Sequence, residues 1–184
     1  MTSPAHTQYV YYTASTMDGF LADSNDSLDW LLTQPIDESG PFPISDLMAK
    51  TGAIVMGATT YQWVLDHTPG EPWPYPEQQT FVFSHRKFEK VHPSITVVSG
   101  QPAANRELLE KAAGDLGVWV VGGGGLAAAF AADGMLDEMV VSYAPVTLGA
   151  GRPLFDGAFD FELLETAQNR AFLIGRYRVV RARG

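Results

Sequence analysis

The chain has 184 residues, of which 46% are hydrophobic and 18% are charged, a composition that fits a folded globular protein and excludes a disordered or collagen-like chain. Twelve Lys and Arg residues against twenty-one Asp and Glu residues give a net charge of −9. This charge argues against nucleic acids and anionic membranes as partners, because both require a basic surface. The sequence contains no cysteine, which excludes disulfides, cysteine nucleophiles and zinc–thiolate sites.

We expect one domain over residues 1–184, with its core from about residue 9 to residue 180, because no linker or repeat interrupts the chain. The N-terminus shows no basic segment followed by an apolar run. No stretch approaches the roughly 18 consecutive apolar residues of a membrane span. We therefore expect a cytoplasmic protein that does not bind membranes.

Apolar runs of strand length recur along the chain, with helical stretches between them. The predicted strands are Tyr9–Ser15, Ala53–Met56, Thr80–Phe83, Ile95–Val98, Val118–Val121, Met139–Ala144, Phe161–Thr166 and Phe172–Val180. The predicted helices are Asp29–Leu32, Ile44–Lys50 with Ser45 as its N-cap, a helix from Thr59 or Thr60 to about Asp66, Asn105–Ala113 and Leu126–Ala132. Loops are expected at His67–Gln79, which holds four of the twelve prolines, and at Pro145–Leu154.

The alternation of strands and helices predicts an α/β fold with right-handed βαβ units and a mostly parallel sheet. The last two predicted strands flank the turn Gln168-Asn169-Arg170. They therefore predict a closing antiparallel hairpin.

The strongest functional signal is a buried strand that runs into a helix through Gly122, Gly123, Gly124 and Gly125. The first N–H groups of a helix lack intrahelical partners and lie at the positive end of its dipole, so they suit a phosphate. Glycines also let a pyrophosphate approach the backbone closely. A tight turn without a ligand is the alternative, but four consecutive glycines favour a nucleotide site.

The spacing Gly122-x-Gly124-x-x-Ala127 formally fits a Rossmann fingerprint. The motif, however, follows several predicted strands instead of the first one. The strand after it, Met139–Ala144, contains no acidic residue to bind a ribose. We therefore do not expect a Rossmann domain.

Two further predicted strands end in small or polar residues. The residues at these ends are Gly57, Thr59 and Thr60 in one case and Ser84, His85 and Arg86 in the other. The carboxyl ends of neighbouring parallel strands share one edge of a sheet, where ligands bind. The three loops together therefore describe a dinucleotide along that edge, although Ser84–Arg86 alone would be a solvated turn.

Candidate residues on the substrate side are fewer. Asp18 and Gly19 follow the first predicted strand, and Trp30 could stack on a heterocycle, although an indole near a strand is more often part of the core. Asp46 is a candidate proton donor or anchor, with a solvated carboxylate as the alternative. The four histidines have no metal-ligand spacing, so we expect no metal site.

In the glycine-rich turn and the segments that follow the predicted strands, the chain resembles the dihydrofolate reductase-like superfamily. Within that superfamily it resembles stand-alone homologues of the riboflavin-biosynthesis reductase domain, the RibD C-terminal family. The matching segments are Ala14-Ser-Thr-Met-Asp-Gly-Phe, Asp29-Trp30, Ile54-Val-Met-Gly-Ala-Thr-Thr-Tyr, Phe83-Ser84 and Val120-Val-Gly-Gly-Gly. The most specific stretch runs from Gly134-Met-Leu-Asp-Glu-Met to Ala144-Pro-Val-Thr-Leu-Gly-Ala-Gly-Arg-Pro-Leu-Phe155. The resemblance covers about Tyr9 to Val180.

The resemblance implies a three-layer α/β/α fold with a mainly parallel central sheet, NADPH as hydride donor and a homodimer. It implies phosphate-side contacts to the cofactor from Gly57, Thr59 and Thr60, 2′-phosphate contacts from Ser84, His85 and Arg86, and pyrophosphate contacts from Gly122, Gly123, Gly124, Gly125 and Leu126. Asp18 and Gly19 match the loop that covers the nicotinamide in relatives.

Two departures from the family pattern bear on these implications. Relatives usually carry an arginine after the glycine that Gly57 matches, where it contacts the 2′-phosphate, but here the residue is Ala58. Arg86 or His85 would have to supply that charge, so NADPH and NADH both stay open. True dihydrofolate reductases anchor the pterin through an acidic residue on their first long helix. Only Asp46 lies near that place, at too short a spacing, so we do not expect folate reduction.

These features predict an NAD(P)H-dependent oxidoreductase that acts on a small heterocyclic or carbonyl substrate, with no nucleic-acid partner. The family-level assignment is reduction of the ribosyl group of 5-amino-6-(5-phosphoribosylamino)uracil. The proton would come from water, from Asp18 or from Asp46. The alternatives are a non-catalytic nucleotide-binding or regulatory protein, and a dihydrofolate, pterin or carbonyl reductase of the same fold. The apolar edge of the closing hairpin also favours a homodimer, because a free edge invites pairing.

Overall fold

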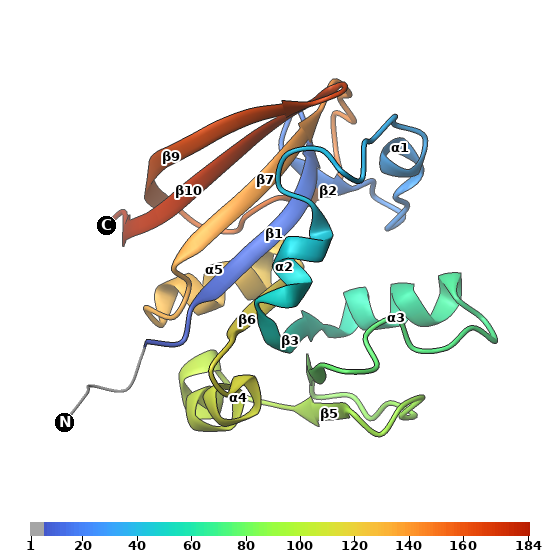
Figure 1. Ribbon diagram of the computed structural model, residues 1–184, viewed down its shortest axis with the longest axis vertical. Coiled ribbons are helices and arrows are strands. Elements are labelled where there is room, and N and C mark those ends of the chain that lie inside the picture. The colour runs from blue at the N-terminus through green and yellow to red at the C-terminus, as the bar shows by residue number, and fades with distance from the viewer. Residues whose placement is uncertain (1–5) are drawn as a thin grey trace.

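An eight-stranded sheet with the order β5-β4-β3-β6-β1-β7-β10-β9 forms the centre of the protein, whose computed structural model describes residues 6–184 (Figure 1). The strands of this sheet are β1 (Tyr9–Thr16), β3 (Thr51–Gly57), β4 (Gln79–Phe83), β5 (Ile95–Val98), β6 (Gly117–Gly122), β7 (Glu138–Ala144), β9 (Phe159–Asn169) and β10 (Phe172–Ala182). Two short strands, β2 (Phe20–Ala22) and β8 (Arg152–Pro153), pair in a second sheet.

Five α-helices and one 3₁₀-helix accompany the sheet in residues 6–184. They are α1 (Asp29–Leu32), α2 (Ile44–Ala49), α3 (Ala58–His67), η1 (Pro102–Asn105), α4 (Arg106–Ala113) and α5 (Gly124–Ala132). Within that part of the chain, every helix is too short or too polar to cross a membrane.

The order of the strands places a switch point in the middle of the sheet. The chain goes from β1 to β3, β4 and β5 and then returns with β6, which lies between β1 and β3 and runs parallel to both. Trp119 of β6 accordingly pairs with Val10 of β1 on one side and with Ile54 of β3 on the other. In open α/β sheets such a reversal opens a crevice at the carboxyl ends of the strands.

Helices cover both faces of the parallel part of the sheet, which confirms the predicted α/β/α layering (Figure 1). Val55 of β3 faces the cluster that contains Leu109 of α4 and Phe130 of α5. The next residue back, Ile54, faces the opposite cluster, which contains Tyr61 of α3. Because alternate side chains of a strand point to opposite faces, burial on both faces explains why β3 reads as a continuous apolar run.

The closing hairpin is also confirmed, and it is longer than predicted. β10 pairs antiparallel with β7 on one side and with β9 on the other. Both hairpin strands span 11 residues, and the turn between them holds Arg170 at φ 50°. β9 lies at the end of the sheet order.

Two predicted helix starts and one predicted N-cap are wrong. Ser45 is not the N-cap of α2, because a proline precedes Ile44 and fixes the extended backbone from which the helix begins. Neither Thr59 nor Thr60 caps α3, which begins directly after the glycine that ends β3. α5 begins at Gly124, two residues before the predicted start. The last two shifts bring both helix N-termini closer to the ends of their strands.

The predicted loop Pro145–Leu154 contains β8, whose partner β2 the sequence did not predict. Both strands are too short to carry an alternating pattern of their own. Their pairing ties the segment after β7 to the segment after β1.

Phe130 offers a test of the cluster that supports the glycine-rich turn. Its side chain is fully buried, and its ring centroid lies 5.7 Å from that of Tyr9 and 5.6 Å from that of Phe83. We expect Phe130→Ala to lower the free energy of unfolding by about 3–5 kcal/mol through lost burial and a new cavity. Leu108→Ala, at a side chain that is 44% exposed, should cost under about 1 kcal/mol. Urea denaturation of both variants measures the difference, and equal losses would contradict this view of the core.

Candidate functional site

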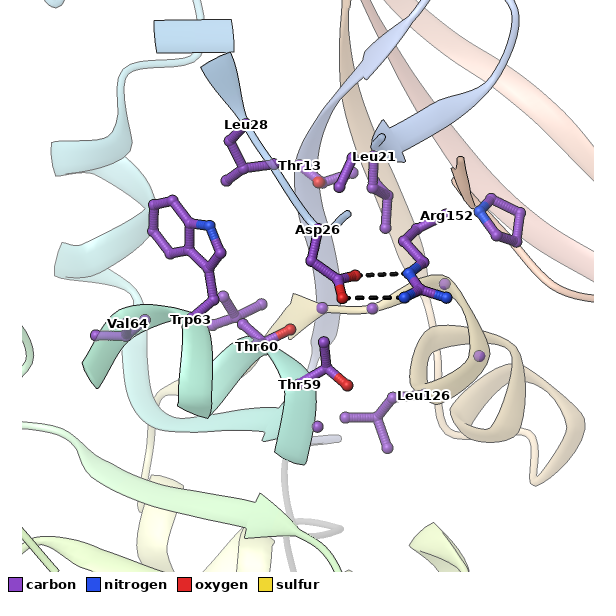
Figure 2. Close-up of a pocket in the computed structure, with 18 of the residues that line it drawn as sticks. Thr13, Leu21, Asp26, Leu28, Thr59, Thr60, Trp63, Val64, Leu126 and Arg152 are labelled. Atoms are coloured by element: carbon purple, nitrogen blue, oxygen red, sulfur yellow. Dashed lines mark hydrogen bonds and ion pairs between the residues drawn. The ribbon is translucent and has the colours of Figure 1, made fainter. Parts of the chain in front are cut away.

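A cavity of about 520 Å³ opens at the carboxyl ends of β1, β3 and β6 (Figure 2). Two strand-to-helix connections border it, β3 to α3 through Gly57 and β6 to α5 through Gly122 and Gly123. The segment between β2 and α1 and the strand β8 contribute the remaining walls. The cavity therefore lies at the switch point of the sheet, where ligands of such folds bind.

The first residues of both bordering helices line the cavity. They are Ala58, Thr59 and Thr60 of α3 and Gly124, Gly125 and Leu126 of α5. In the described part of the chain, no side chain caps either N-terminus with a hydrogen bond. The leading N–H groups are thus left for a ligand, and two helix dipoles favour an anion there.

Gly124 is required by a close approach of two backbone segments. A Cβ at this position would lie 2.7 Å from the carbonyl oxygen of Leu154 and would also collide with that of Pro153. The backbone N–H of Asp156 points back to the Gly124 carbonyl at 3.4 Å. The glycine-rich turn and the segment around β8 therefore fit together only without a side chain at residue 124.

Arg152 and Asp26 form a bidentate ion pair at the cavity (Figure 2). Arg152 Nε donates to Asp26 Oδ1 at 2.5 Å, and Nη2 donates to Oδ2 at 2.9 Å. These hydrogen bonds lower the pKa of the Asp26 carboxyl and raise the pKa of the Arg152 guanidinium. Both groups therefore stay charged at neutral pH, and the pair links the segment before α1 to β8.

An apolar wall lies on the other side of Asp26 (Figure 2). Leu28, Trp63 and Val64 form this wall, opposite Leu126 and Arg152. The Trp63 ring stacks on His67 with centroids 4.0 Å apart. Its Nε1 is buried and has no hydrogen-bond partner among residues 6–184, and Figure 2 shows this nitrogen on the cavity side of the ring.

The structure brings together eight of the predicted cofactor-binding residues. They are Gly57, Thr59, Thr60, Gly122, Gly123, Gly124, Gly125 and Leu126. They come from two connections that are far apart in sequence but adjacent at the edge of the sheet, because β3 pairs with β6. The sequence argument from neighbouring strand ends thus predicted the location of the cavity.

Ser84, His85 and Arg86 do not line the cavity but lie next to it along the same edge. They follow Phe83, the residue of β4 that pairs with Gly57. The Ser84 hydroxyl accepts a hydrogen bond from the Arg86 backbone N–H at 2.9 Å, and the Arg86 guanidinium lies 5.2 Å from the centre of the Phe88 ring. A ligand would have to extend beyond the cavity to meet these three residues.

Asp18 and Gly19 also lie outside the cavity lining. The Asp18 carboxylate accepts hydrogen bonds from the Thr16 hydroxyl at 2.6 Å and from the backbone N–H groups of Leu148 and Gly149. These bonds, chiefly that from Thr16, lower the pKa of Asp18. Gly19 occupies a turn at φ 85°, and its carbonyl accepts a hydrogen bond from Leu154. The geometry gives Asp18 a role in holding loops, and its role in catalysis stays a prediction.

Trp30 and Asp46 likewise stand apart from the cavity. Trp30 is buried in the cluster with Phe172 and Ile174, and its Nε1 donates to the Leu21 carbonyl at 3.2 Å. It therefore positions Leu21, which lines the cavity, and its role in stacking on a substrate stays a prediction. Asp46 lies exposed in the first turn of α2. Its proposed role as proton donor also stays a prediction.

Asp26, Arg152 and Trp63 are the residues that the sequence analysis missed. Trp63 follows Thr59 and Thr60 by one helical turn, so the spacing on α3 could have placed it on the same face. The ion pair joins residues 126 positions apart, and nothing in the local sequence pairs them. As for metals, residues 6–184 contain no group of three or more Asp, Glu or His side chains placed to hold an ion.

The fold and the cavity together define a class: an α/β domain of dihydrofolate reductase-like architecture with a crevice at the switch point of its sheet. The chain belongs to the RibD C-terminal domain family, whose sequence profile matches residues 8–171. The uncharacterized Bacillus subtilis protein YwjB is 29% identical over 146 residues, which cover 79% of this chain and 81% of YwjB. A candidate riboflavin biosynthesis protein from Shewanella sp. PV-4 has a similar structure, with a TM-score of 0.79, 25% identity and coverage of 95% of this chain and 100% of that one.

Two more distant structures share the fold. One is the Thermotoga maritima diaminohydroxyphosphoribosylaminopyrimidine deaminase/5-amino-6-(5-phosphoribosylamino)uracil reductase, with a TM-score of 0.67, 17% identity and coverage of 95% of this chain and 57% of that one. The other is dihydrofolate reductase from Enterococcus faecalis in complex with NADP(H), with a TM-score of 0.57, 15% identity and coverage of 97% and 98%.

The hydrogen bonds to Asp18 predict a pH-dependent contribution to stability. Because its folded-state pKa is lowered, the stabilisation is present above the unfolded pKa of about 3.9 and is lost as the pH falls through the folded pKa. We expect Asp18→Asn to be less stable than the wild type at neutral pH, with the gap closing below about pH 4. Denaturation curves from neutral to acidic pH test this. Asp115→Asn, at an exposed position, is the control, and a gap that did not vary with pH would contradict the prediction.

Gly124 and Gly125 provide a matched pair of substitutions in the turn. We expect Gly124→Ala to destabilise the protein by about 1–3 kcal/mol, because the new methyl group meets fixed backbone atoms. Gly125→Ala should stay closer to the wild type, because its methyl group would lie 3.0 Å from the Asp156 carboxylate, which can rotate away. Thermal or urea unfolding distinguishes the two, and equal losses would argue against the close approach.

Proposed function

We propose that the protein is an NAD(P)H-dependent reductase of a small heterocyclic or carbonyl substrate. The observation that carries the proposal is the cavity at the switch point, bordered by two uncapped helix N-termini and by glycines. The relationship to the RibD C-terminal family and the fold shared with an NADP(H)-binding reductase support it. A bound reduced nicotinamide would supply a hydride to an electrophilic carbon of the substrate.

The residues present fit such a cofactor. A Cβ at Gly57 would meet nothing closer than 3.8 Å and one at Gly123 nothing closer than 3.9 Å, so at both positions the missing side chain leaves space beside the backbone. We assign the pyrophosphate to the backbone N–H groups of the turn from Gly122 to Leu126. Thr59 and Thr60 would donate hydroxyl hydrogen bonds on the same side.

We assign the adenosine end to the loop after β4. Ser84, His85 and Arg86 lie one strand further along the edge, which is where an extended dinucleotide would reach. Ala58 at the start of α3 supplies no charge, so Arg86 would be the principal partner of a 2′-phosphate. NADPH is therefore the cofactor that we expect, and NADH remains the alternative.

On the substrate side, the protein would orient the reacting carbon and exclude water, while a proton comes from solvent, Asp18 or Asp46. The reductase named for the Thermotoga neighbour suggests 5-amino-6-(5-phosphoribosylamino)uracil as the first substrate to test. A pterin, another carbonyl compound, or nucleotide binding without turnover are the alternatives. We also propose a homodimer in the cytoplasm, with the free edge at β9 as the candidate contact.

Titration with NADPH and NADH tests the cofactor assignment. We expect Arg86→Ala to weaken NADPH binding about tenfold and to leave NADH binding nearly unchanged, because only NADPH carries the 2′-phosphate. Lys87→Ala is the control, since it removes an adjacent exposed cation from the same loop.

The possible outcomes separate the parts of the proposal. If Arg86→Ala bound NADPH as tightly as the wild type, the placement of the adenosine end would be wrong. If the wild-type protein bound neither nucleotide, the reductase function itself would be overturned. Binding without oxidation of NADPH in the presence of any of the carbonyl, pterin or uracil compounds would leave the non-catalytic alternative.

A further inference from the structure

We propose that the substrate part of the cavity selects an uncharged, planar heterocycle with a hydrogen-bond acceptor and discriminates against a phosphorylated substrate. The inference rests on the proposed reductase function and revises its substrate, from the phosphorylated uracil compound to an unphosphorylated one. It is drawn from the charges and the unpartnered donor that the cavity presents beyond the glycine-rich turn.

The charged side chains of the cavity disfavour a phosphate. Asp26, Asp156 and Arg152 are the charged residues that line the cavity, so two carboxylates face one guanidinium. Arg152 is the only lining cation within residues 6–184, and Asp26 holds it through both carboxylate oxygens. A substrate phosphate would therefore find no free positive side chain in the cavity.

A phosphate could reach Arg152 only by displacing Asp26. The displaced carboxylate would then lie beside the phosphate without a partner, and like charges at that separation are unfavourable. The cofactor phosphates would not need Arg152, because the helix N-termini offer them backbone N–H groups. The cavity thus accepts anions at the helix ends and disfavours them next to Asp26.

Leu28, Trp63 and Val64 form a wall that favours a flat ligand. These side chains present apolar surface and the nitrogen-bearing edge of the indole toward the ion pair (Figure 2). A flat ring buries such surface well. The wall therefore favours a planar, weakly polar ligand.

Trp63 adds a polar requirement to this wall. Its indole N–H is buried and has no acceptor in the described part of the chain. A buried donor without an acceptor is unfavourable, so a carbonyl oxygen or ring nitrogen of the ligand would be favoured there. Because the nitrogen is buried, the indole has to shift slightly for this donor to meet the ligand.

The test compares two ligands that differ only in the phosphate. We would measure binding of 5-amino-6-(ribosylamino)uracil and of its 5′-phosphate to the protein saturated with NADP⁺. We expect the unphosphorylated compound to bind at least tenfold more tightly. Equal or tighter binding of the phosphate, or binding of neither compound to the cofactor complex, overturns the inference. Failure to bind the cofactor would instead overturn the reductase function on which it rests.

Asp26→Asn tests the charge argument directly, because it frees Arg152. We expect the ratio of the Kd values of the phosphorylated and unphosphorylated compounds to shift about tenfold in favour of the phosphorylated one. Asp156→Asn is the matched control: it changes the cavity charge by the same amount without touching Arg152, and should shift the ratio less than threefold. Equal shifts in the two variants would overturn the role of the ion pair.

Arg152→Gln provides an independent test in case Asp26→Asn disturbs the loop that carries Asp26. If Arg152 contacts the substrate phosphate in the wild type, Arg152→Gln will lose affinity for the phosphorylated compound selectively, and that result overturns the inference. We expect a similar effect on both compounds.

Trp63→Phe tests the indole donor. It keeps an aromatic ring and removes the N–H, so we expect about fivefold weaker binding of the unphosphorylated compound and no change in the Kd for NADPH. Unchanged affinity for the unphosphorylated compound would overturn the assignment of Trp63.

Discussion

The backbone of α5 at Gly124 lies against the carbonyl groups of Pro153 and Leu154, and this contact determines how the cavity is built. Only a residue without a side chain allows the segment that contains β8 to cross the end of β6 so closely. Leu154 in turn donates its N–H to the Gly19 carbonyl at 2.8 Å, and β8 pairs with β2. The glycine-rich turn is therefore a place where three distant parts of the chain meet, as well as a place where a phosphate can approach. Arg152 reaches the cavity as a consequence of that meeting.

The two halves of the cavity differ in the source of their chemistry. One half consists of helix N-termini that the parallel sheet positions, and its chemistry comes from backbone N–H groups. The other half is formed by loops that cross the strand ends, and its chemistry comes from side chains: an apolar wall and the pair of Asp26 with Arg152. The N–H groups at a helix N-terminus attract anions whatever the side chains around them. A guanidinium that is already paired with a carboxylate attracts a further anion only weakly. A dinucleotide and an uncharged heterocycle would thus find separate, complementary surfaces in one crevice.

The sequence was sufficient for the fold and for one half of this crevice, for a physical reason. Strands such as β3 are buried on both faces and appear as short apolar runs, and a strand followed at once by glycines and a helix specifies a local geometry that needs no distant partner. The other half depends on contacts between residues that are more than a hundred positions apart, such as Asp26 with Arg152 and Asp18 with Leu148. Asp18 and Trp30 are a polar and an aromatic residue near strand ends, which made them candidates for the site. Tertiary contacts give them roles in holding loops and in packing, which no local pattern reveals.

Ala58, the residue after Gly57, affects the charge of the cavity next to the N-terminus of α3. An arginine at position 58 would lie in the lining of the cavity at the start of α3, where it would provide a free cation beside the helix N-terminus. With Ala58 in its place, the lining carries more carboxylates than cations, and the attraction for phosphate there depends on the helix dipoles. Dipole attraction is short in range and falls off within the first turn of a helix. A phosphate bound at the turn would accordingly be held at the helix ends, while any charge needed for a 2′-phosphate must come from outside the cavity, where Arg86 lies against Phe88. With Ala58 at this position, the two ends of a dinucleotide would be recognised by different parts of the protein, and the apolar wall around Trp63 would be left for the substrate.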